Sequence, residues 1–247
     1  MSIYAIGDLH LHFGCELKAK DQLTDPAWKN HEERLYRYCV ERIHPEDTLV
    51  LVGDHSFGKT MAECKPDFDY IRSLPGKKVL IRGNHDMFWD AMKTAKLNRE
   101  IEGMTFLQGN YVAVGNVALV GTKGFTFEGP YYLNRRGQVA GWDEEKKEHA
   151  DRIIERELDR LEASFRMAQE DGFTRFLMFL HYPPTNILES KSDFTWMAER
   201  YGAEQVIYAH SHGEARFHDS IQGMNHGIQY RLVSGDYLRW RPEKILE

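Results

Sequence analysis

Short apolar runs that end in a polar, metal-binding type of residue recur five times along the chain. Each run is rich in Val, Ile, Leu or aromatic residues and terminates in Asp, Asn or His. Buried strands have this pattern, and α/β sheets place their chemistry at the carboxyl ends of such strands. We therefore expect five strands whose ends meet at one site. The runs cover residues 3–10, 48–54, 79–86, 176–181 and 205–212.

Between these strands, the spacing of apolar residues changes to that of helices. One helix is expected to open at Asp25-Pro26, because Asp suits the N-cap and Pro the first helical position, and to stop at Pro45. A second, amphipathic helix is expected from about Asp143 to Gln169, where apolar residues recur at helical spacing.

The remaining strand signals indicate a second sheet. Residues 104–121 are expected to form short strands joined by Gly-Asn turns, and residues 214–239 are also expected to be rich in strands. Parallel strands followed by turn-linked strands predict an α/β fold with two packed sheets between helices. No linker, repeat or low-complexity stretch interrupts the pattern, so we expect a single domain over residues 1–247.

Composition agrees with an intracellular globular protein. The chain is 42% hydrophobic, which is sufficient for a large core. It contains no apolar run of 18 residues and begins directly with a strand, so we expect neither a membrane span nor a signal peptide. The three cysteines, Cys15, Cys39 and Cys64, form no C-x-x-C pair, which favours a reduced, cytoplasmic location.

The side chains at the five strand ends are of the types that bind metals. Residues two apart in an extended chain point the same way, so Asp8 with His10, and His210 with His212, can each face one site. Asp54 is a carboxylate that can bridge two cations. Mixed nitrogen and oxygen ligands suit Mn, Fe or Zn better than Ca or Mg, and the lack of cysteine argues against a structural zinc clip. The full set is Asp8, His10, Asp54, Asn84, His181, His210 and His212.

In these motifs the chain resembles the calcineurin-like metallophosphoesterases. That family carries D-x-H, G-D, G-N-H-[DE], a lone His after a strand, and G-H-x-H, in the order found here between residues 7 and 212. The resemblance implies a four-layer αββα sandwich, with two mixed β-sheets flanked by helices, of the metallo-dependent phosphatase type. It also implies a first metal held by Asp8, His10 and His212, a second held by Asn84, His181 and His210, and Asp54 shared between them.

Two departures from the family pattern affect this interpretation. Ala209 stands where the family usually has Gly, which could shift the loop. After Gly53-Asp54, the second Asp and the Arg of the protein serine/threonine phosphatases are missing. That pattern disfavours a protein phosphatase and leaves Asp86 as the residue expected to orient His85.

The activity implied is metal-assisted hydrolysis of a phosphoester. Two divalent cations, most simply Mn²⁺ with Fe or Zn as alternatives, would share a hydroxide that attacks the phosphate and would neutralise its charge. By resemblance, His85 would protonate the leaving oxygen as general acid.

Substrate contacts are expected outside the ligand set. His55 lies next to the bridging carboxylate and could meet substrate, although a hydrogen-bonded loop histidine is the alternative. Arg135 and Arg136 could bind a phosphate or could simply be solvated. The segment 130–142 is the least regular stretch of the chain, and we hypothesise that it forms a lid.

The charge balance bears on the class of substrate. The chain has 38 acidic and 32 basic side chains and a net charge of −6. A polymer binder draws its affinity from many Lys and Arg contacts, so we expect a small soluble mono- or diester and consider nucleic acid disfavoured. A nuclease is the alternative enzyme, and a non-catalytic binding module is a third class, disfavoured because every ligand and His85 are present. Nothing in the sequence indicates an oligomeric state.

Overall fold

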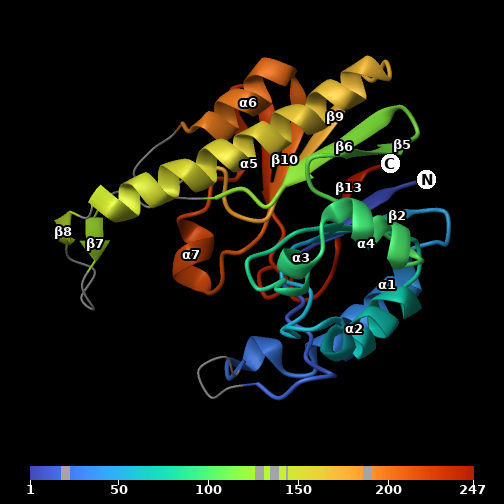
Figure 1. The fold of residues 1–247 in the computed structure, drawn as a ribbon. Helices are drawn as coiled ribbons and strands as arrows, with labels where there is room; N and C mark the ends of the chain where they lie inside the picture. The colour runs from blue at the N-terminus through green and yellow to red at the C-terminus, as the bar shows by residue number, and fades with distance from the viewer. Residues whose placement is uncertain (18–22, 126–130, 134–138, 143, 186–190) are drawn as a thin grey trace.

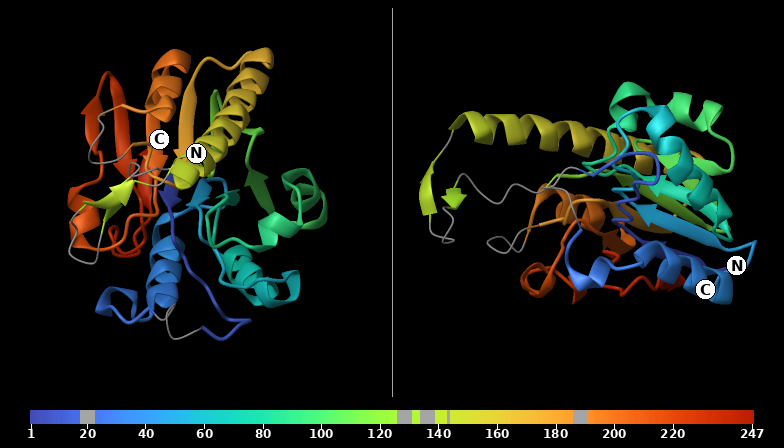
Figure 2. Two further views of the ribbon diagram at one scale, coloured as in Figure 1. Left: turned by 60° about the vertical axis from the view of Figure 1, so that its left-hand side comes forward. Right: turned by 90° about the horizontal axis from the view of Figure 1, so that it is seen from below.

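Two β-sheets packed face to face form the centre of the molecule (Figures 1 and 2). The computed structural model describes residues 1–17, 23–125, 131–133, 139–142, 144–185 and 191–247. Helices cover the outer faces of both sheets, so the described residues form four layers in the order helix, sheet, sheet, helix. This arrangement confirms the predicted fold class.

The first sheet contains three of the five predicted strands. Its strand order is β13-β1-β2-β3-β4, with β1 to β4 parallel and β13 antiparallel to β1. The sheet is therefore mixed. Its strands are β1 (Ile3–Ile6), β2 (Thr48–Val52), β3 (Lys77–Ile81), β4 (Met104–Leu107) and β13 (Glu243–Leu246).

The second sheet contains the other two predicted strands, β9 and β10. Its strand order is β11-β12-β10-β9-β6-β5, with a parallel centre and an antiparallel strand at each edge. Its strands are β5 (Tyr111–Val114), β6 (Val117–Thr122), β9 (Phe176–Leu180), β10 (Ala203–Tyr208), β11 (Gly223–Asn225) and β12 (Ile228–Leu232). A separate antiparallel pair is formed by β7 (Tyr131–Leu133) and β8 (Val139–Trp142).

The helices divide between the two outer faces. The first sheet is covered by α1 (His31–Arg42), α2 (Met61–Ser73), α3 (Phe88–Ala91) and α4 (Thr94–Glu100). The second is covered by α5 (Glu144–Glu170) and α6 (Asp193–Tyr201). The 3-10 turn η2 (Pro26–Trp28) precedes α1, and the short helix α7 (Glu214–His218) follows β10.

Alternation along the strands builds the core between these layers. In β1, Ile3 and Ala5 pack in the cluster between the two sheets, whereas Tyr4 and Ile6 pack against the helices. Successive side chains of a strand point to opposite faces, so a strand buried on both faces is apolar throughout. This is why the central residues of the predicted runs are apolar on both faces of the strand.

Several predicted elements are confirmed, and two are corrected. The long helix over 143–169 is α5, and Gly115-Asn116 joins the hairpin β5–β6. The helix predicted from Asp25 is wrong as one element: Asp25 caps only η2, and Asn30, with φ 51°, separates that turn from α1. The stretch 214–239 begins with α7 rather than a strand. No helix among the described residues is long and apolar enough to cross a bilayer.

Candidate metal centre

The seven predicted ligands lie at the carboxyl ends of five parallel strands, where the two sheets meet. The loops are tied together by backbone hydrogen bonds: the Asp8 amide donates to Gly53 O (3.0 Å), the His10 amide to Asp54 O (2.8 Å), and the Ala209 amide to His181 O (3.1 Å). The first two bonds join the loops after β1 and β2, and the third joins the loops after β9 and β10.

Three ligands form a group that we call the rim cluster: Asp8, His10 and His212. Their donor atoms all lie within 4.8 Å of one another. Nε2 of His10 is 3.4 Å from Nε2 of His212, which in turn is 3.7 Å from Oδ1 of Asp8. The His212 side chain is one-third exposed, so this cluster reaches the protein surface.

The other four ligands form the core cluster: Asp54, Asn84, His181 and His210. Their donor atoms converge on Nε2 of His181. Oδ1 of Asn84 is 2.8 Å from this nitrogen, Nδ1 of His210 is 3.2 Å from it, and Oδ2 of Asp54 is 3.4 Å from it. His181 is fully buried, and its Nδ1 faces the carbonyl oxygen of Val52 at 3.0 Å. Strands of both sheets therefore fix this ring.

Asp54 lies between the two clusters. Its Oδ2 is 3.7 Å from Nε2 of His10 in the rim cluster and 3.4 Å from Nε2 of His181 in the core cluster. Its Oδ1 accepts a hydrogen bond from the amide of His85 at 2.7 Å. One carboxylate oxygen thus faces both clusters while the other oxygen fixes the side chain.

The donor set fits divalent cations. In each cluster, two imidazole nitrogens face one another at 3.2–3.4 Å with carboxylate oxygen nearby, an arrangement that a bound cation satisfies. The set combines imidazole, carboxylate and amide oxygen without sulfur, which suits Mn, Fe or Zn. Which ion is bound remains a prediction.

Burial keeps two of the four ligand imidazoles neutral, whereas neighbouring carboxylates raise the pKa of the other two, His181 and His212. Burial lowers the pKa of His10 to about 3 and that of His210 to about 2, so both rings are neutral at neutral pH. Burial also opposes charge on His181, but the adjacent Asp54 carboxylate outweighs it and raises the pKa of His181 to about 9. For Asp54, burial alone would raise the pKa, yet His181 holds it well below its usual value.

The backbone at the ligands is in an unusual conformation. Asp8, His10, Asp54 and His210 all have positive φ, between 45° and 69°. Such angles are uncommon for residues other than glycine and cost free energy, and they concentrate at functional sites where surrounding structure enforces them. The strained backbone therefore supports a functional role for this edge of the sheets.

The methyl group of Ala209 packs against Gly7 in the loop after β1. A Cβ atom added to Gly7 would lie 2.4 Å from the Cβ of Ala209, so the glycine in the first motif leaves room for this methyl group. Ala209 is fully buried. The departure from the family pattern at residue 209 is thus accommodated by packing against residue 7.

Asp236 was missed by the sequence analysis. Its Oδ1 lies 3.1 Å from Nδ1 of His212, and its Oδ2 accepts the amide of Gly213 at 3.2 Å. A carboxylate that binds the second nitrogen of a ligand histidine orients the ring and raises its basicity. A weak signal was present: Gly235-Asp236 comes three residues after the end of β12, and Gly53-Asp54 comes directly after β2.

His85 lies beside the rim cluster and is half-buried. Its ring centroid is 5.4 Å from that of His10 and 5.3 Å from that of Phe57. Trp28 packs on the other side, 5.4 Å from His10 and 5.2 Å from His212. Aromatic rings therefore surround the rim histidines. The His85 ring is among them and remains partly exposed beside His10.

Asp86 does not orient His85, contrary to prediction. It is buried and accepts hydrogen bonds from the amides of Gly83 (2.7 Å), Asp54 (3.0 Å) and His55 (2.8 Å), and it pairs with Nδ1 of His55 at 2.8 Å. Its carboxylate accepts amides from two loops, the one after β2 and the one after β3. Asp86 therefore holds the Asp54 and Asn84 loops together.

Of the two alternatives for His55, the structure favours the hydrogen-bonded loop histidine over the substrate contact. His55 is 0% exposed, and its two ring nitrogens face Asp86 and the carbonyl oxygen of Leu51. Arg135 and Arg136 lie outside the described residues. Of the segment 130–142, the described part is the strand pair β7–β8, which lies beyond the start of α5, apart from the main sheets (Figures 1 and 2). The lid hypothesis stays a prediction.

Two clusters of candidate metal ligands between two packed sheets agree with a metal-dependent phosphoesterase, and a family model identifies the chain as one. The family model for calcineurin-like phosphoesterases matches residues 1–214, and the chain belongs to this family. A search of curated proteins finds no significant match.

Two solved structures resemble this chain in fold. One is a phosphopantetheinyl hydrolase from Mycobacterium tuberculosis, with a TM-score of 0.54, 15% identity, and coverage of 99% of this chain and 95% of that one. The other is a protein of unknown function from Aquifex aeolicus, with a TM-score of 0.49, 13% identity, and coverage of 98% and 95%.

Proposed function

We propose that this protein hydrolyses a small soluble phosphoester with two divalent cations, Mn²⁺ being the first choice. The observation that carries the proposal is the position of Asp54, whose Oδ2 faces a histidine of each cluster. A carboxylate placed in this way can bridge two cations.

The residues would divide the work as follows. The rim cluster would hold one cation, and Asn84, His181 and His210 would hold the other, with Asp54 contributing to both. Two cations bound there would supply an activated water and neutralise the charge of the phosphate. Asp236 and the Val52 carbonyl would keep the His212 and His181 rings in binding orientation.

His85 would act as general acid on the leaving oxygen. Its amide is bound to Asp54, which fixes its position relative to the bridging carboxylate, and its half-buried ring lies beside His10. Proton delivery from a positioned side chain typically contributes about 10²–10⁴ in rate.

The alternatives differ in substrate or in class. A nuclease would act on polymers, and a binding module would not turn over any ester. We propose a cytoplasmic location, which the free thiols of Cys15, Cys39 and Cys64 support.

A hydrolysis panel on manganese-loaded protein tests the proposal. It should contain a chromogenic monoester, a chromogenic diester, a phosphopantetheinyl ester and single-stranded DNA, each at low and physiological salt. We expect turnover of a small ester with shallow salt dependence. Faster turnover of DNA with a steep salt slope would favour the nuclease, and no turnover by protein with full metal content would favour the binding module.

A further inference from the structure

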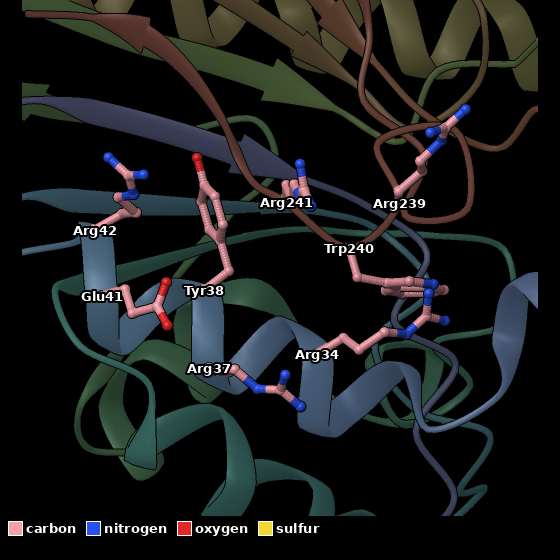
Figure 3. A pocket seen from close by; sticks show the side chains of 8 residues that line it. All are labelled: Arg34, Arg37, Tyr38, Glu41, Arg42, Arg239, Trp240 and Arg241. Atoms are coloured by element: carbon pink, nitrogen blue, oxygen red, sulfur yellow. The ribbon is translucent and has the colours of Figure 1, made fainter.

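Five arginines gather around one pocket on the outer side of α1. The pocket has a volume of about 580 Å³ and is formed by α1 and the turn before β13 (Figure 3). None of its lining residues is one of the seven metal ligands. The lining consists of Arg34, Arg37, Tyr38, Glu41, Arg42, Arg239, Trp240 and Arg241.

The charge of this pocket is unusual for the protein. Five guanidinium groups face one carboxylate, in a chain whose net charge is −6. Within the described ranges, none of these five arginines has a carboxylate within 4 Å. Most of the other described arginines are paired with a carboxylate, as Arg160 is with Glu157 and Arg175 with Glu204. The overall charge balance therefore concealed a local positive site.

The donor groups are also incompletely satisfied. Nε of Arg34 is buried and has no hydrogen-bond partner, although the other end of its guanidinium binds the carbonyl oxygen of Ala27. In Figure 3, Arg34 lies beside Trp240, while Tyr38, Arg42 and Arg241 extend in a common direction. A buried donor without an acceptor costs free energy, so this guanidinium is held at the pocket at a cost.

The turn that supplies two of the arginines is held in a costly conformation. Arg239 and Trp240 have φ values of 53° and 64°, a region that bulky residues rarely occupy. Trp240 is fully buried, its Nε1 donates to Ala27 O at 2.8 Å, and its ring packs against Trp28. With the tryptophan anchored inside, Arg239 and Arg241 on either side of it remain exposed.

We propose that this arginine pocket binds a small anion that carries two or more phosphate groups. Guanidinium groups bind phosphate through a two-bond fork, and one phosphate group cannot engage five of them. A nucleic-acid strand is the less suitable ligand, because strand binding uses a row of exposed aromatic rings, whereas Trp240 is buried and only Tyr38 offers a partly exposed ring.

Calorimetry with inorganic tripolyphosphate tests the proposal. The metal-loaded full chain is titrated at fixed ionic strength, with excess Mg²⁺ so that the probe does not strip metal from the protein. Two double variants remove arginines from opposite walls: R239Q/R241Q from the turn and R37Q/R42Q from α1. The matched control, R99Q/R152Q, makes the same change in charge at exposed arginines outside the pocket.

We expect both pocket variants to bind tripolyphosphate at least about tenfold more weakly than the wild type, since each loses charge-assisted hydrogen bonds. The control should bind within twofold of the wild type. Binding at the metal centre would persist in all variants, so unchanged affinity in both pocket variants would overturn the proposal. Equal weakening in the control would also overturn it, as would tighter, arginine-dependent binding of a single-stranded oligonucleotide.

Discussion

The rim and core clusters offer the same kinds of donor atoms but are supported differently. In the core cluster, the fully buried His181 is held by the carbonyl oxygen of Val52, a residue of β2. In the rim cluster, His212 is one-third exposed and is held by the side chain of Asp236. The His181 ring is thus held by a strand of the sheet, whereas the His212 ring is held by one carboxylate in a turn.

This difference predicts which changes affect one metal and which affect both. Asp54 faces both clusters, Asp236 supports only the rim, and His85 belongs to neither ligand set. Variants at these positions should therefore separate into classes by metal content as well as by activity.

The largest effect is expected for Asp54→Asn. Removal of the shared charge should eliminate most activity and weaken both metals by more than about 100-fold, beyond the 10–100-fold that is typical for an outer-shell partner. Asp8→Asn is the comparison, because Asp8 is a candidate ligand in the rim cluster only and should mainly affect one metal. Its contacts with the core cluster are to the His210 amide and to Nδ1 of His181, not to the ring nitrogen of His181 on which the core ligands converge. Calorimetric metal titration of each variant would measure the affinity for each of the two metals. Normal affinity for both metals in the Asp54 variant would contradict the shared role.

The next effect is expected for His85→Ala. Both metals should stay bound while kcat falls by roughly 10²–10⁴, as for a lost general acid. The loss should shrink for esters with very acidic alcohols, which leave without a proton. His218→Ala is the matched control, because His218 is exposed on α7. If the His85 variant lost metal instead, His85 would be a ligand and the acid would have to be another group.

A smaller and selective effect is expected for Asp236→Asn. Loss of the carboxylate should weaken the rim metal by about 10–100-fold and leave the core metal unchanged. Asp219→Asn, at an exposed site, removes the same charge without touching a ligand. Stepwise metal titration distinguishes the two sites, and parallel weakening of both would show that Asp236 does not act through His212.

The smallest effect on catalysis is expected for His55→Gln. Because His55 is buried against Asp86, the substitution should leave KM unchanged and lower stability by about 1–3 kcal/mol, the usual cost of an unsatisfied buried group. For a chain of this size, Tm should fall by roughly 2–12 °C. Thermal melting and steady-state kinetics would measure the two quantities. A raised KM with unchanged Tm would restore the substrate-contact hypothesis.

The sequence predicted the two sheets with their flanking helices, and it predicted that the candidate ligands meet at the strand ends. Both follow from local patterns. Buried strands are apolar on both faces, and a polar residue at the strand end is visible without any knowledge of contacts. The position of Ala209 could not be evaluated in this way, because its methyl group fits only through contact with Gly7 in another strand loop.

Interactions between distant segments were less accessible. Asp86 is adjacent to His85 in sequence, yet its carboxylate binds the amides of the loop after β2. The arginine pocket combines one face of α1 with a turn about 200 residues later, so net charge concealed it. Asn30 broke the predicted helix through a left-handed φ that no propensity argument required.

If Asp54 is shared by two metals, its carboxylate should couple them magnetically, and electron paramagnetic resonance of manganese-loaded protein detects such coupling. We expect two Mn²⁺ per chain with an exchange-coupled spectrum in the wild type, and loss of that coupling in Asp54→Asn. One Mn²⁺ per chain, or two Mn²⁺ with uncoupled spectra in the wild type, would contradict the shared role of Asp54.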